Sequence, residues 1–159
     1  MPADQMEIKK IVAAIDLSKY SEDTFLHALM LARALGAKLV LLNVIDTRYL
    51  DTLAQYDVEG LDRDKIIRET VDAHRESIEK DYLTRSQGVD IEVMFKHGLP
   101  WEEVIHAVKE MGTDLLVVGS KGHSDVAGVL FGSVAEKLQR HAPCPVLVVR
   151  GPEHMRAAK

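Results

Sequence analysis

The chain has 159 residues, enough for one domain with a substantial core, and its 47% hydrophobic and 28% charged content excludes a disordered chain. The net charge of −5 and the lack of a Lys/Arg cluster argue against a nucleic-acid partner, and no segment reaches the ~20 apolar residues of a membrane span. A single cysteine, Cys144, excludes an intrachain disulfide and is compatible with the cytoplasmic location that we expect.

Strand and helix signals alternate along the chain. Residues 38–45 are almost uniformly apolar, which is typical of a strand covered on both faces. Residues 89–96 alternate between apolar and polar side chains, which predicts a half-exposed edge strand. The expected strands are 8–16, 38–45, 89–96, 114–118 and 146–149, and the expected helices are 21–36, 61–85, 100–112 and one that starts near 132.

Several boundaries carry specific signals. Ser21 is the predicted N-cap of the first helix, which ends at Gly36, and Pro100 stands in the first turn of the third helix. Residues 46–60 show no period and predict a loop. Five strands that alternate with four helices predict an α/β fold of three layers, an open parallel sheet with helices on both faces. We expect a single domain over residues 1–159, with its core at about 8–150.

The most informative segment is the loop after the fourth strand. Gly119 and Gly122 follow that strand directly, and Gly132 and Ser133 open the next helix. Glycine permits positive φ and lets a ligand approach the main chain, while a helix N-terminus presents unpaired N–H groups. These features favour a phosphate cradle, although a plain strand-to-helix connection gives the same glycines. The loop matches neither a Walker A motif nor a dinucleotide fingerprint.

The glycine spacing, Gly119-x2-Gly122-x9-Gly132-Ser133, resembles the ATP-binding signature of the universal stress protein family. The resemblance covers almost the whole chain, including residues 11–16, 42–44, 96–105 and 135–149. It implies an adenine-nucleotide alpha-hydrolase-like fold with strand order 3-2-1-4-5. In that order Asp16 and Gly119 lie on opposite sides of one crevice, at the point where the strand order reverses.

The resemblance also implies roles for ten residues, and an eleventh candidate, His123, lies in the same loop. Asp16 would approach the ribose, although it is also placed to cap the turn that follows it. The main chain of Val44 would meet the adenine edge, and His123 would either touch phosphate or simply be exposed. Asp125 departs from the family pattern by adding a negative charge to the loop. The wall of the base would be Ala14, Ile15 and Val118, and the phosphate ligands would be Gly119, Gly122, Gly132, Ser133 and Val134.

The expected function is an ATP-binding stress-response or signalling module, with AMP or ADP as the alternative nucleotides and Mg²⁺ or Mn²⁺ bound through the phosphates. No side-chain metal ligands and no catalytic residues are expected. The competing interpretations are a slow ATPase or phosphotransfer enzyme that uses the same cradle, and a dimerisation module that binds no nucleotide. Residues 146–149 form an apolar edge strand, so we expect a homodimer through it. The sequence names no protein partner and no physiological signal.

Overall fold

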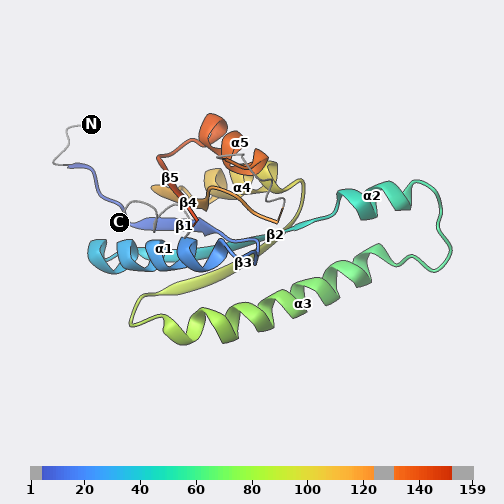
Figure 1. The fold of residues 1–159 in the computed structure, drawn as a ribbon, viewed down its shortest axis with the longest axis horizontal. Helices are drawn as coiled ribbons and strands as arrows, with labels where there is room; N and C mark the ends of the chain where they lie inside the picture. Colours follow the sequence, from blue (N-terminus) through green and yellow to red (C-terminus); the bar gives the residue numbers. More distant parts are fainter. Residues whose placement is uncertain (1–4, 124–130, 152–159) are drawn as a thin grey trace.

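The computed structural model describes residues 5–123 and 131–151. A five-stranded parallel sheet forms its centre, in the order β3-β2-β1-β4-β5 (Figure 1). The predicted layered fold and strand order are thereby confirmed. The strands are β1 (Lys10–Ala14), β2 (Lys38–Asp46), β3 (Ile91–Gly98), β4 (Leu115–Gly119) and β5 (Val146–Val149).

Five α-helices lie within the described residues, one more than the sequence predicts. The additional helix is α2, which lies in the segment 46–60 that was expected to be a loop. This short helix has no buried residue, so it carries no apolar stripe that a periodicity could reveal. The helices are α1 (Ser21–Leu35), α2 (Arg48–Ala54), α3 (Arg63–Asp81), α4 (Pro100–Glu110) and α5 (Ser133–His141), with a 3-10 turn, η2 (Leu83–Arg85), after α3.

The helices cover both faces of the sheet (Figure 1). On one face α1, α3 and the C-cap residue of α3 bury Phe25, Ile78 and Tyr82 against β1 and β2. On the other face α4 and α5 bury Val104, Val108 and Leu138 against alternate residues of the same strands. Because β1, β2 and β4 are covered on both sides, their sequences read as continuous apolar runs.

The ends of the helices follow the sequence signals at some positions and not at others. Gly36 ends α1 in the left-handed conformation, with φ of 64°, and donates its N–H to the carbonyl of Arg33. The predicted N-cap role of Ser21 is wrong, because the cap position is Tyr20 and no side chain caps the helix. The Ser21 hydroxyl instead donates to Asp16 Oδ1, at 3.2 Å.

The register brings the carboxyl ends of the central strands to one level. Ala14 of β1 lies beside Leu42 of β2 and Val118 of β4. The chain then continues from β2 into the arm, which we define as residues 48–62. Figure 1 shows α2 extending away from the sheet, with α3 returning beneath it. The carboxyl edge of the sheet is therefore bordered by loops, by the base of the arm and by helix termini.

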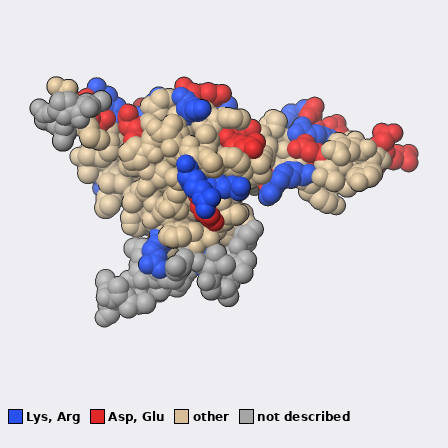
Figure 2. All heavy atoms as spheres, turned by 90° about the horizontal axis from the view of Figure 1, so that it is seen from above, with Lys and Arg blue, Asp and Glu red and all other residues tan. Residues whose placement is uncertain are grey.

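Charged side chains of both signs are interspersed on the face that Figure 2 shows, over the body of the molecule and over the arm. Across the part of the chain that the structure describes, no helix combines the length and the apolar character that a membrane span requires.

Candidate functional site

A cavity of about 410 Å³ opens at the carboxyl edge of the sheet, within the range of small-molecule sites. Residues from β1, β2, β4 and each of the helices α1 to α5 line it. All eleven residues that the sequence nominates lie in this lining: Ala14, Ile15, Asp16, Val44, Val118, Gly119, Gly122, His123, Gly132, Ser133 and Val134. The structure therefore brings together positions that are up to 120 residues apart, the separation of Ala14 and Val134.

One end of the cavity is built from main chain. Gly132 is the N-cap of α5 and has no side chain with which to cap it, so the first N–H groups of this nine-residue helix lie beside the cavity. Its N–H donates to the carbonyl of Ser120, at 2.7 Å, which fixes the helix start beside β4. The combination of glycines and a helix start gives this end the chemistry of an anion site.

The glycines at this end of the cavity matter because they lack a side chain, and not because they adopt unusual backbone angles. Gly119, Gly122 and Gly132 do not have positive φ, so the positive φ that glycine permits is not used at these three positions. A Cβ at Gly119 would lie 3.1 Å from the Lys121 carbonyl oxygen, and one at Gly122 would lie 2.2 Å from Asp16 Oδ2. At Gly132 a Cβ would make only ordinary contacts, 3.5 Å or longer.

Asp16 stands at the end of β1 and faces the glycine loop. Its Oδ1 accepts hydrogen bonds from the Ser18 N–H at 2.9 Å and from the Ser21 hydroxyl. These bonds give Asp16 the turn-capping role that the sequence predicts as the alternative to a ribose contact. The other oxygen, Oδ2, lies against Gly122, so the same carboxylate also borders the cavity.

His123 closes the crevice between β1 and the loop. Its side chain is exposed, which is one of the two roles that the sequence predicts for it, the other being contact with phosphate. Its Nε2 contacts the main-chain oxygen of Asp16. It also lines the cavity, so exposure and contact with a bound group are compatible. The unusual Asp125 lies outside the described residues.

The side of the cavity formed by β2 and α3 contains three polar residues that sequence reasoning missed. Asn43 of β2 is 1% exposed, and it bonds both Ile15, which directly follows β1, and His74 of α3. His74 and Thr70 line the cavity from α3. The available signals were a polar residue inside the apolar run 38–45 and a histidine on an apolar helical stripe.

Burial shifts the protonation of His74. Desolvation is the main cause that lowers the pKa of its imidazole, and the nearby His123 lowers it further. The ring therefore favours its neutral form, which carries one proton and one free lone pair.

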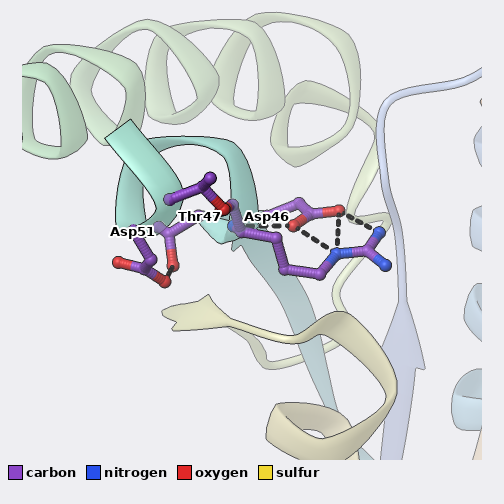
Figure 3. Close-up of polar contacts among 5 residues, drawn as sticks. Asp46, Thr47 and Asp51 are labelled. Carbon is purple, nitrogen blue, oxygen red and sulfur yellow. Dashed lines mark hydrogen bonds and ion pairs between the residues drawn. The ribbon is translucent and has the colours of Figure 1, made fainter. Parts of the chain in front are cut away.

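The base of the arm borders the cavity as well. Figure 3 shows the Thr47 hydroxyl bonded to Asp51, beside the Asp46 carboxylate that holds Arg48. Thr47 is fully buried, and its N–H donates to the Gly98 carbonyl of β3. Hydrogen bonds from Arg63 and then from Thr47 lower the pKa of the Asp51 carboxyl. Of these residues, Asp46 and Arg48 line the cavity.

Metal ligands do not cluster in the parts of the chain that are described. Within residues 5–123 and 131–151, no three His, Cys, Asp or Glu side chains come together in a way that could hold an ion.

Comparison with known proteins identifies relatives along nearly the whole chain. Residues 7–150 match the model of the universal stress protein family. A protein of Staphylococcus haemolyticus (strain JCSC1435), assigned to the universal stress proteins, is 32% identical over 146 residues, which are 91% of this chain and 86% of the relative. The solved structure of the hypothetical protein MJ0577 superposes with a TM-score of 0.76 at 25% identity, over 91% of this chain and 97% of that one.

Two more distant structures contain nucleotides. A universal stress protein in complex with cAMP has a TM-score of 0.64 at 24% identity, over 91% of this chain and 98% of that one. A universal stress protein from Archaeoglobus fulgidus in complex with dAMP has a TM-score of 0.61 at 20% identity, over 90% and 98% of the two chains. At these identities the likeness to this chain is one of fold.

Proposed function

The chain belongs to the universal stress protein family, and we propose that it binds ATP in the cavity at the carboxyl edge of the sheet and acts as a nucleotide-dependent stress-response module. The observation that carries the proposal is the convergence of all eleven nominated residues on one cavity. The complexes of two structural neighbours, with cAMP and with dAMP, support an adenine nucleotide as the ligand class. AMP and ADP are the alternative ligands.

The phosphates would bind at the glycine end. The first N–H groups of α5 and the partial positive charge of its N-terminus favour an anion there. Gly132 and Ser133 adjoin this helix start, and the Ser133 hydroxyl would add one hydrogen bond. Because the described residues hold no cluster of metal-binding side chains, Mg²⁺ or Mn²⁺ would be held through the phosphates.

The nucleoside would occupy the side of the cavity nearer β1 and β2. Asp16 Oδ2 is the carboxylate oxygen that no serine occupies, so it is the acceptor offered to a ribose hydroxyl. Val118 is 3% exposed and Val44 is half-buried, so both supply apolar contact for a flat base. The main chain of Val44 would meet the polar edge of that base.

The binding test replaces the residue at the start of α5. In Gly132→Val the first side-chain atom has room, and we expect its branches to narrow the space beside the first N–H groups of α5, where the phosphate is proposed to bind. We expect affinity for ATP to fall by about tenfold or more, the scale of one or two charge-assisted hydrogen bonds. Calorimetric titration measures the affinity, and circular dichroism verifies the fold.

Gln139→Val is the matched control, because Gln139 is an exposed residue of the same helix outside the cavity lining. It should retain wild-type affinity. A folded Gly132→Val protein that binds ATP as tightly as the control would exclude the proposed phosphate position.

We also propose a homodimer through β5, which is an edge of the sheet. The Pro145 carbonyl accepts a hydrogen bond from the N–H of Leu116 in β4, and the Val149 carbonyl accepts one from the N–H of Ser120, which follows β4. Because alternate residues of a strand bond to opposite sides, Val146 and Val148 direct their peptide groups to the free edge. An apolar edge strand invites pairing, and two copies related by a two-fold axis satisfy it.

A further inference from the structure

A buried hydrogen-bond chain joins β1, β2 and α3 beside the cavity. The Asn43 amide nitrogen, Nδ2, lies 2.8 Å from the carbonyl oxygen of Ile15. The Asn43 carbonyl oxygen, Oδ1, lies 2.8 Å from Nδ1 of His74. Asn43 is 1% exposed, so neither end of its amide can turn to bulk water.

The chemistry of these partners fixes the orientation of the amide. A main-chain carbonyl oxygen is only an acceptor, so the Asn43 group that faces Ile15 must be the NH₂ donor. The reversed amide would bring two carbonyl oxygens to 2.8 Å and leave a buried donor facing the histidine. Oδ1 therefore faces His74, and as an acceptor it requires a proton on His74 Nδ1.

The proton on Nδ1 determines what the other ring nitrogen offers. Burial and His123 lower the pKa of His74, so at neutral and alkaline pH the ring carries one proton only. With that proton on Nδ1, Nε2 has a free lone pair. His74 lines the cavity, and Nε2 has no hydrogen-bond partner among residues 5–123 and 131–151.

We propose that His74 Nε2 is a specificity-determining acceptor that recognises an N–H or O–H donor of the bound nucleotide, either the adenine 6-amino group or a ribose hydroxyl. The inference rests on the proposed nucleotide site. His74 reaches the cavity over β2, whereas the glycines of the anion site follow β4 on the far side of β1. Nε2 is an acceptor, and the phosphates of a nucleotide carry no proton at pH 8, so the donor that it meets is on the nucleoside.

A purely structural role would have a different signature. If His74 only ties α3 to β2 through Asn43, its removal lowers stability and changes the affinity of every nucleotide by the same factor. A specificity role changes the ratio of affinities between ligands that do and do not carry the donor.

The test is a set of titrations at pH 8 with ATP, inosine triphosphate, 2′-deoxy-ATP and 3′-deoxy-ATP. The proteins are wild type, His74→Leu and the control His27→Leu. His27 is also a helical histidine with a bonded Nδ1, 2.8 Å from the Asp23 carbonyl oxygen, but it lies outside the cavity lining. We expect the ratio of ATP affinity to analogue affinity to fall about three- to tenfold in His74→Leu for the analogue that lacks the recognised donor, the scale of one hydrogen bond. His27→Leu should keep all the wild-type ratios.

The outcomes separate this inference from the function on which it rests. Wild-type protein that binds no nucleotide overturns both. Binding by the wild type with the same affinity ratios in His74→Leu overturns the specificity role alone.

A measurement without ligand tests the underlying geometry. Nitrogen-15 chemical shifts of the histidine rings should show His74 with a protonated Nδ1 and a bare Nε2 at pH 8. Protonation of Nε2 there overturns the inference whatever the protein binds.

Discussion

Replacing Gly122 by alanine should destabilise the protein through one specific side chain, Asp16. An added Cβ would lie 2.2 Å from Asp16 Oδ2, whereas ordinary contacts begin at 3.4 Å. Gly122 does not have positive φ, so the added methyl group causes no backbone strain of its own. The carboxylate must therefore withdraw by about 1 Å, or the loop must move away from β1.

The magnitude follows from what that movement breaks. Oδ1 accepts from the Ser18 N–H at 2.9 Å and from the Ser21 hydroxyl at 3.2 Å. Rotation of the carboxylate lengthens both bonds, and each contributes about 0.5–1.5 kcal/mol. We expect Gly122→Ala to lower the free energy of unfolding by about 1–3 kcal/mol.

The assay is urea unfolding of a double-mutant cycle. It comprises wild type, Gly122→Ala, Asp16→Ala and the double variant. Removing the carboxylate removes the obstacle, so Gly122→Ala should cost no more than about 0.5 kcal/mol in the Asp16→Ala background. An equal cost of Gly122→Ala in both backgrounds would refute the reasoning, because the clash would then lie elsewhere.

Three further predictions concern assembly, catalysis and pH. Val148→Pro removes a peptide N–H on the free edge of β5 and should yield a folded monomer by analytical ultracentrifugation; a monomeric wild type at high micromolar concentration would exclude the dimer. Phosphate release should stay far below the ordinary turnover of ~10 per second, because the loop after β4 does not match a Walker A motif and lacks the lysine that such a motif places on the phosphates. Arg85 forms a bidentate ion pair with Glu22 and lowers the pKa of the Glu22 carboxyl, so Arg85→Ala should lower the urea midpoint of unfolding at pH 7. The lowered pKa of Glu22 adds stability that is fully present above the unfolded pKa and is lost as the pH falls through the folded pKa. The difference should therefore shrink over that range to the part that comes from the Arg85 contacts with the Asp81 carbonyl and the Phe25 and Tyr82 rings.

The sheet was predictable because each strand carries its environment in its composition. Residues 38–45 are apolar on both faces, and β2 is covered on both faces by helices. Residues 89–96 alternate, and β3 forms an edge of the sheet. The α2 helix was not predictable from periodicity, since it is held by polar contacts at its base. The Thr47 hydroxyl and the Arg63 guanidinium both bond the Asp51 carboxylate. Arg63 and Asp51 are 12 residues apart in the sequence.

The candidate site divides in the same way. Its glycine end follows from local sequence, because Gly119, Gly122 and Gly132 flank one loop and their spacing resembles a known signature. The other end depends on a contact between Asn43 and His74, which are 31 residues apart and on different elements. Each residue alone appears as a polar interruption of an apolar pattern. Only the packing of α3 on the sheet shows that they satisfy each other.

The position of Asp16 constrains how an anionic ligand could use this site. Oδ1 is held by two serine groups, so only Oδ2 is available to a ribose, and Oδ2 also lies against Gly122 of the anion site. A phosphate that approached Gly122 would therefore meet a negative charge. A divalent cation on the phosphates offsets that repulsion, and so does a ligand whose phosphates lie toward Gly132 and away from Gly122. The unequal occupation of the two Asp16 oxygens thus favours Gly132 and the start of α5 as the principal phosphate contacts.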